Sequence, residues 1–112
     1  MNKKNENSVT LTLTLNDRSF SKLFKAFGDP TRLKILKLLA SKDMSVNEIV
    51  AEIGLSQPTI SRHLSILREA DVVMDRRDGQ NVIYSLIRQN VESCCAGFCD
   101  CLSISIKKKR KK

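Results

Sequence analysis

The sequence has few of the residues that interrupt regular structure: its 112 residues include only four glycines and two prolines. This excludes a collagen-like or Gly/Pro-rich disordered chain, and the hydrophobic share of 41% is that of a globular domain. No apolar run approaches the length of about 18 residues that a membrane-spanning helix needs. A chain this short has room for one core, which excludes a multidomain enzyme. The polar start, Met1 to Asn7, lacks the apolar stretch of a secretory signal and predicts a cytoplasmic protein.

Excess positive charge is almost absent outside one end of the chain. The net charge of +8 comes from 20 Lys and Arg against 12 Asp and Glu, and six of those basic residues form the run Lys107 to Lys112. Without this run, 14 basic residues face 12 acidic ones, so net charge alone does not indicate nucleic-acid binding. We expect an N-terminal arm over 1–16, a folded domain over 17–102 and a basic tail over 103–112.

Hydrophobic periodicity predicts a mainly α-helical domain with a small β-hairpin. Apolar residues alternate with threonine over residues 9–15, a pattern that suits a short strand or an ordered arm. From Asp17 the apolar residues follow helical spacing instead, in a predicted helix that ends near Gly28. Its apolar stripe holds Phe20, Leu23, Phe24 and Phe27, which either pack inside the domain or form a subunit interface. A second helix begins at Asp29-Pro30, where the carboxylate can cap it and the proline suits its first turn.

A helix-turn-helix is predicted next. Ser45 and Glu48 form a capping box for one helix, Gly54 ends it, and Ser56 begins another helix that runs to about Ala70. Two strands, Val72 to Met74 and Val82 to Leu86, follow with Asp78-Gly79 at their turn, and a last helix begins near Arg88. The polar hairpin tip holds Arg76, Arg77, Gln80 and Asn81.

The second helix of a helix-turn-helix enters the DNA major groove and presents its N-terminal residues to the bases. The candidates here are Gln57, Thr59, Ser61, Arg62 and His63. Gln can pair with adenine and Arg with guanine, whereas the alternative is an ordinary solvated helix face. Arg76 and Arg77 of the hairpin are candidate DNA contacts or ordinary surface charges. His63, the one histidine, suits a DNA contact, a hydrogen-bonded residue at the core edge, or, least of all, a metal ligand.

Three stretches carry a family pattern: FGDPTRLKILKLLA at Phe27 to Ala40, LSQPTISRHLSILREADVV at Leu55 to Val73, and DRRDGQNVIYSL at Asp75 to Leu86. Over about residues 18–101 the chain resembles the ArsR/SmtB family of metal-responsive transcriptional repressors. The resemblance implies a winged helix-turn-helix homodimer whose terminal helices form the dimer interface. It also implies binding to an inverted-repeat operator in double-stranded DNA and an inducer that lowers DNA affinity.

Two sensor sites of that family are missing from this sequence. Ser45-Val46-Asn47 stands where one arsenic-responsive branch has Cys-Val-Cys, and residues 87–101 lack the histidines of zinc-responsive members. A third departure is Asp71, which stands where the family usually has Gly. Asp tolerates the left-handed backbone conformation better than most residues.

All four cysteines, Cys94, Cys95, Cys99 and Cys101, fall within eight residues. Thiolates select soft ions, and trivalent arsenic or antimony takes three of them. Cys94 and Cys101 would be about 10.5 Å apart along an unbroken helix. We therefore expect the segment to bend, most easily at Gly97. Arsenite-responsive family members have a Cys-Cys pair and a third, later Cys, which Cys94, Cys95 and Cys101 match, with Cys99 as a substitute or spare.

The sequence thus predicts a repressor with no constitutive cofactor that releases DNA on binding As(III) or Sb(III). Sensing of cadmium, lead, or a thiol-redox or sulfur signal is the alternative. A thiol enzyme is a further alternative, but its nucleophile would need a basic partner or a helix N-terminus. The cluster is expected at a helix C-terminus, where the dipole disfavours thiolate.

Overall fold

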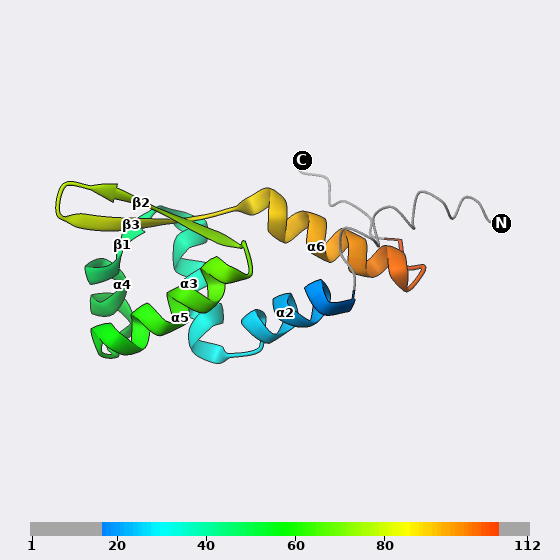
Figure 1. The fold of residues 1–112 in the computed structure, drawn as a ribbon, viewed down its shortest axis with the longest axis horizontal. Coiled ribbons are helices and arrows are strands. Elements are labelled where there is room, and N and C mark those ends of the chain that lie inside the picture. Colours follow the sequence, from blue (N-terminus) through cyan, green and yellow to red (C-terminus); the bar gives the residue numbers. More distant parts are fainter. Residues whose placement is uncertain (1–16, 106–112) are drawn as a thin grey trace.

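The computed structural model describes residues 17–105 as a helical body with a three-stranded antiparallel sheet. Figure 1 labels the elements in chain order: α2 (Asp17–Phe27), α3 (Pro30–Ser41), β1 (Met44–Ser45), α4 (Val46–Ile53), α5 (Gln57–Glu69), β2 (Val73–Asp78), β3 (Asn81–Leu86) and α6 (Arg88–Cys101). The expected arm at 1–16 and most of the basic tail, 106–112, lie outside the described residues. None of the helices in the described part is long and apolar enough to cross a membrane.

Local capping signals set the helix boundaries, as predicted. The Asp29 carboxylate accepts hydrogen bonds from the backbone amides of Thr31 and Arg32 at 2.9 and 3.1 Å. The capping box of α4 is complete, with the Ser45 hydroxyl accepting from the Glu48 amide and the Glu48 carboxylate accepting from the Ser45 amide. Gly54 ends α4 in the left-handed conformation, with φ at 85°. The turn to α5 is therefore tight.

The core lies where α3, α4 and α5 meet the sheet. Its fully buried side chains include Ile35, Leu39, Ile49, Ile60, Leu64, Leu67, Val72 and Val73. Three of these form the apolar line of α5, so the opposite side of that helix is free to face solvent.

The sheet differs from the prediction in two respects. β1 was not predicted, and it pairs with β3 through Met44 and Tyr84. The hairpin strands also extend further toward the turn than expected, because Arg76 and Arg77 are paired with β3 and do not lie in a loop. Only Gly79 and Gln80 lie between the strands, and Gly79 has a positive φ of 68°, as a tight hairpin turn requires.

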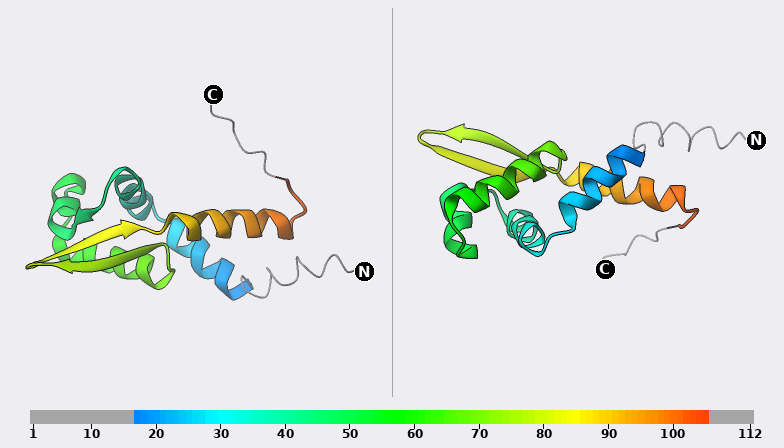
Figure 2. Two further views of the ribbon diagram at one scale, coloured as in Figure 1. Left: turned by 90° about the horizontal axis from the view of Figure 1, so that it is seen from above. Right: turned by 60° about the horizontal axis from the view of Figure 1, so that its bottom comes forward.

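Helices α2 and α6 lie next to each other and project from the side of the body opposite the hairpin (Figures 1 and 2). The Phe98 ring of α6 makes edge contacts with Phe24 at 4.7 Å and Phe20 at 5.5 Å between centroids. The phenylalanine stripe thus packs within the chain, although Phe24 stays 40% exposed.

The expected bend at Gly97 is wrong. Helix α6 is continuous from Arg88 to Cys101, and Gly97 lies on its buried side. Packing of the adjacent Phe98 against α2 holds this segment helical and outweighs the flexibility of a single glycine.

Candidate nucleic-acid interface and thiol cluster

The first turns of α5 present a polar surface at one end of the helix-turn-helix. Ser56 caps the helix by accepting from the Thr59 amide, and its hydroxyl donates to the Thr59 hydroxyl at 2.9 Å. The exposed Gln57 side chain donates to the Ser61 hydroxyl at 3.1 Å. These bonds are between neighbours on one exposed surface, where a ligand with hydrogen-bonding edges can replace them.

Arg62 is the long basic side chain of this surface. It is exposed, and no hydrogen-bond or ion-pair partner is found for it among residues 17–105. A guanidinium held on a rigid helix without an internal partner is suited to a bidentate acceptor such as a guanine edge or a phosphate.

The hairpin lies beside this surface, but its two arginines have different environments. The Arg76 guanidinium donates to the Asp43 carboxylate at 3.1 Å and to the Ser85 hydroxyl at 3.3 Å. The Ser85 hydroxyl and the Arg76 guanidinium hold the pKa of the Asp43 carboxyl below its usual value. Arg77 is exposed and, within the described range, has no such partner. Of the two, Arg77 is the one available to a ligand without breaking an ion pair.

A shallow polar cavity separates the hairpin from the N-terminal ends of α4 and α5. It is lined by Val46, Asn47, Gln57, Gln80, Asn81 and Val82. Because Gln57 belongs to both the cavity lining and the α5 surface, the hairpin tip adjoins the candidate DNA-contacting residues at this point.

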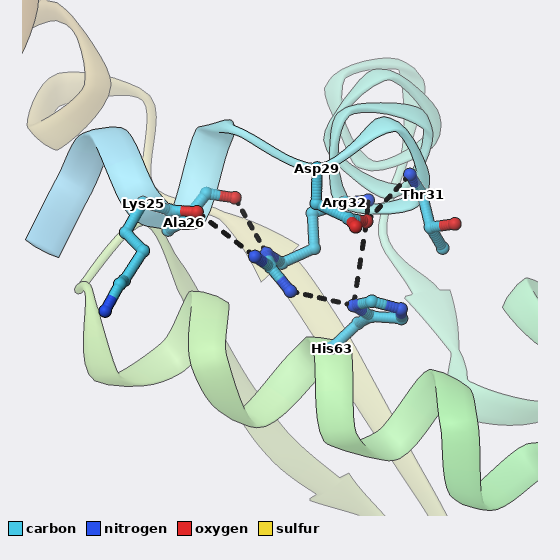
Figure 3. Close-up of polar contacts among 6 residues, drawn as sticks. All are labelled: Lys25, Ala26, Asp29, Thr31, Arg32 and His63. Atoms are coloured by element: carbon cyan, nitrogen blue, oxygen red, sulfur yellow. Dashed lines mark hydrogen bonds and ion pairs between the residues drawn. The ribbon is translucent and has the colours of Figure 1, made fainter.

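His63 is directed away from that region, toward the junction of α2 and α3 (Figure 3). Its Nδ1 atom is 3.0 Å from the terminal nitrogen Nη1 of Arg32 and 3.9 Å from the Asp29 carboxylate. Arg can only donate, so Nδ1 is the acceptor and the neutral ring carries its proton on Nε2. Of the three sequence-based interpretations, this geometry fits the hydrogen-bonded residue at the core edge.

The same Arg32 guanidinium reaches the C-terminal end of α2. Its Nε donates to the Ala26 carbonyl at 2.9 Å, and Nη2 donates to the Lys25 carbonyl at 3.1 Å (Figure 3). Beside it, the hydrogen bond from the backbone amide of Arg32, supported by the charge of the Arg32 guanidinium, holds the pKa of the Asp29 carboxyl below its usual value. We call the three side chains Asp29, Arg32 and His63 the polar node.

Sequence reasoning did not identify Arg32 or Asp43 as partners of candidate site residues. Arg32 and His63 are 31 positions apart, and Asp43 and Arg76 are 33 apart. No local pattern reports a pairing over such a separation. The one local signal was the helix start at Asp29, which indicated a cap and not a link to α5.

The four cysteines of α6 have unequal environments. Cys94 is 1% exposed within the core, and burial, aided by the nearby Cys95, raises the pKa of its thiol. Cys95 and Cys101 are exposed and Cys99 is half-buried. Cys94, Cys95 and Cys99 are free thiols.

The continuous helix does not bring the expected three ligands together. Cys94 and Cys101 share a face of α6 but lie two turns apart, whereas Cys95 and Cys99 are one turn apart. Across residues 17–105 no group of three or more His, Cys, Asp or Glu side chains is arranged to hold a metal ion. A three-thiolate site at Cys94, Cys95 and Cys101 therefore requires the end of α6 to change conformation.

Comparison with known proteins places this arrangement among bacterial regulators. Residues 29–74 match the family described as "Bacterial regulatory protein, arsR family". The transcriptional repressor SdpR of Bacillus subtilis is 50% identical over 64 residues, which cover 57% of this chain and 71% of SdpR. The arsenic resistance transcriptional regulator ArsR1 of Pseudomonas putida is 43% identical over 82 residues, covering 70% of this chain and 64% of ArsR1.

A solved structure agrees with this placement. HlyU from Vibrio cholerae superposes with a TM-score of 0.62 at 31% identity, covering 77% of this chain and 96% of HlyU. Residues 29–74, the segment that matches the arsR family, include both helices of the helix-turn-helix described above, α4 and α5. The chain therefore belongs to the arsR family of bacterial regulatory proteins, and it is a winged helix-turn-helix transcriptional repressor.

Proposed function

We propose that this repressor binds an inverted-repeat operator as a homodimer and releases it when As(III) or Sb(III) binds the thiols of α6. The observation that carries the DNA-binding part is the polar surface of α5, free of apolar bulk and continuous with the hairpin. Its proposed contacts to DNA are Gln57, Thr59, Ser61, Arg62, Arg76 and Arg77. His63, expected among them, is proposed to support α5 from behind through Arg32.

Operator binding by two matched variants tests this surface. Arg62→Ala and Arg68→Ala each remove one positive charge from α5, so both lose a similar amount of sequence-independent attraction. Arg68 lies in the last turn and pairs with Asp75 at 3.0 Å. Loss of a base contact costs about 1–3 kcal/mol, and we expect it only for Arg62→Ala. Equal operator affinities for the two variants would remove Arg62 from the recognition set.

Dimerisation is proposed through α2 and α6. Phe24 on α2 and Leu102 and Ile104 beyond α6 are 40%, 53% and 51% exposed. Exposed apolar side chains at this end, away from the DNA surface, suit a second copy of the chain. Phe24→Glu should shift the sedimentation of the protein toward the monomer, and Leu55→Glu, on the turn between α4 and α5, serves as the matched control.

The proposed inducer site is made of Cys94, Cys95 and Cys101, with Cys99 as a substitute. Soft thiolate donors alone, without histidine nearby in α6, favour a thiophilic centre. Binding such a centre requires Cys94 to leave the core and the last turns of α6 to unwind. The similarity to a regulator named for arsenic resistance supports arsenic as that centre.

The proposed release mechanism is linkage between α6 and DNA. An inducer shifts the repressor toward a low-affinity state only if it binds that state more tightly. Unwinding the end of α6 disturbs the contact of Phe98 with α2, and we propose that the two recognition helices then no longer match successive grooves.

Operator titrations with and without arsenite test this mechanism. We expect wild type to lose affinity about 5- to 150-fold and Cys95→Ser to keep DNA binding but lose the response. Ser93→Ala, next to the cluster but without a thiol, is the control and should respond like wild type. A Cys95→Ser variant that still releases the operator normally contradicts the proposed site.

A disulfide signal, like the metalloid signal, requires α6 to change conformation, because the continuous helix holds the thiols apart. Cβ atoms one helical turn apart, as for Cys95 and Cys99, are about 5–6 Å from each other. A disulfide needs about 3.5–4.5 Å between Cβ atoms, so this pair cannot close one while α6 stays helical. Comparing operator affinity after peroxide and after arsenite separates the redox alternative from the proposed one.

A further inference from the structure

The Arg32 side chain on α3 makes a direct polar connection between α2 and the proposed recognition helix α5. Its guanidinium donates to two backbone carbonyls in the last turn of α2, Lys25 and Ala26, and to the imidazole of His63 on α5. One planar group thus holds positions on two helices at the same time (Figure 3).

The guanidinium uses three of its five N–H donors here, one on each nitrogen. The fixed fork of a guanidinium satisfies three acceptors only when they keep their relative directions. The Lys25 carbonyl also accepts from the Gly28 backbone amide at 3.2 Å, whereas the Ala26 carbonyl, near the end of the helix, receives its hydrogen bond from Arg32. A rotation or shift of α2 relative to α5 therefore breaks at least one of the three bonds.

We infer that Arg32 is the positioning residue that couples α2 to the recognition helix α5 through His63. Displacement of α2 is transmitted to α5 by the loss of the guanidinium's bond to the imidazole. The effect on DNA is indirect, because neither Arg32 nor His63 needs to contact the operator for it to occur.

The proposed inducer site reaches this connection through the aromatic contact between α6 and α2. Phe98 packs against Phe20 and Phe24, and it is the immediate neighbour of Cys99. A conformational change in the last turns of α6 moves this aromatic contact, and Phe20 and Phe24 lie five residues and one residue before Lys25, whose carbonyl accepts from Arg32. This part of the inference rests on the proposed thiol-induced release, whereas the coupling of α2 to α5 does not.

Packing offers a competing route, because Leu23 and Ala26 of α2 belong to the same core as Leu64 and Leu67 of α5. The experiment must therefore separate the loss of the polar connection from a general loosening of the core. Ile35→Val serves this purpose: it removes one methyl group from a fully buried side chain on the same helix as Arg32 and leaves the polar node in place.

The first measurement is the ratio of operator affinities with and without arsenite. Arg32→Lys keeps the positive charge but loses the planar fork, and His63→Leu removes the acceptor. We expect both to lose most of the wild-type ratio, whereas His63→Asn, which keeps an acceptor close to the ring nitrogen, and Ile35→Val retain it. A wild-type ratio in both Arg32→Lys and His63→Leu overturns the inference.

The second measurement needs no inducer, so that failure of the proposed function and failure of this inference can be distinguished. Coupling is reciprocal, so operator binding at α5 should change hydrogen exchange of the amides of residues 24–28 at the end of α2. We expect a change of severalfold in wild type and Ile35→Val, and none in His63→Leu. If wild type fails to respond to arsenite but shows this change, the proposed inducer is wrong and the coupling stands. An equal change in His63→Leu overturns the coupling.

Discussion

Cys94 differs from the neighbouring Cys95 in what it can react with, although they are adjacent in sequence. The Cys94 thiol is 1% exposed and its pKa is raised by burial, whereas Cys95 is exposed. Alkylation requires an accessible thiolate. In the folded protein we expect iodoacetamide to modify Cys94 at least about tenfold more slowly than Cys95, as followed by peptide mass spectrometry. In denaturant, where both thiols are accessible, the two rates should be equal, and this serves as the reference. Equal alkylation rates for Cys94 and Cys95 in the native protein as well would contradict the burial of Cys94.

The raised pKa of Cys94 also predicts a pH dependence of stability. A thiol in the unfolded chain ionises near about pH 8.5, whereas folded Cys94 keeps its proton to higher pH. Its contribution to stability is therefore complete below the unfolded value and is lost as pH rises through the folded one. Urea denaturation at neutral and alkaline pH should show a smaller alkaline loss for Cys94→Ala than for wild type. Tyr84, whose pKa is also raised by burial, contributes equally to both proteins.

Asp71 has a backbone conformation that most side chains disfavour. Its φ is 61°, in the left-handed region, and its backbone carbonyl accepts from the side-chain amide nitrogen of Asn90 at 2.7 Å. We expect Asp71→Ala to lower the free energy of unfolding by about 1 kcal/mol, since alanine is less tolerant of this region. Asp71→Gly should be as stable as wild type or more so, and Asp100→Ala, at an exposed position near the end of α6, is the control. A wild-type stability for Asp71→Ala would show that the strain is absent.

The capping box of α4 is the local signal on which the helix-turn-helix prediction depended. Ser45 and Glu48 exchange two hydrogen bonds of 3.1 and 2.9 Å. Removing the hydroxyl acceptor in Ser45→Ala should cost about 1 kcal/mol of unfolding free energy, measured by urea denaturation. Glu48→Ala should also destabilise, while Glu48→Gln, which can complete the same box, should not. The prediction fails if Glu48→Gln and Glu48→Ala are equally destabilised.

Elements defined by local chemistry could be predicted from the sequence, and those defined by distant partners could not. Asp29, Ser45 and Gly54 act within their own turns, so their helix boundaries followed from residue type and spacing. β1 has two residues and exists only because β3 pairs with it. Gly97 suggested a bend because glycine is flexible, but the contact between α2 and α6 decides the conformation there.

The thiol-binding proposal makes a prediction at the scale of α6. Three bonds from one centre to Cys94, Cys95 and Cys101 cannot form on the continuous helix, because two of the thiols are about 10.5 Å apart along its axis. Saturating arsenite should therefore reduce the helical signal in far-ultraviolet circular dichroism for wild type and leave Cys95→Ser unchanged. Full helical signal with arsenic bound would exclude this ligand set in favour of another.

At the scale of the whole molecule, the proposed DNA-contacting end of α5 and the cysteine-bearing end of α6 lie at opposite ends of the described chain (Figure 1). Sequence patterns predicted the two candidate sites separately, because each is a compact run of chemically distinctive residues. The proposed connection between them includes Arg32 on α3 and His63 on α5, and no single run of the sequence indicated it. Pairings between residues far apart in the sequence thus had to come from the structure.

The basic run Lys107 to Lys112, which lies outside the described residues, carries most of the net charge. Deleting it tests how the affinity for DNA is divided between this tail and the folded domain. Phosphate contacts give affinity without sequence information, and each one neutralised adds about 0.9 to the slope of log affinity against log salt concentration. Deleting the run should reduce that slope by up to about 5 and weaken binding to operator and scrambled DNA by the same factor. The preference for operator should persist, because Arg62 and the other proposed base contacts of α5 remain. If the truncated protein loses its preference, recognition extends into the tail and the α5 surface is insufficient to define the operator.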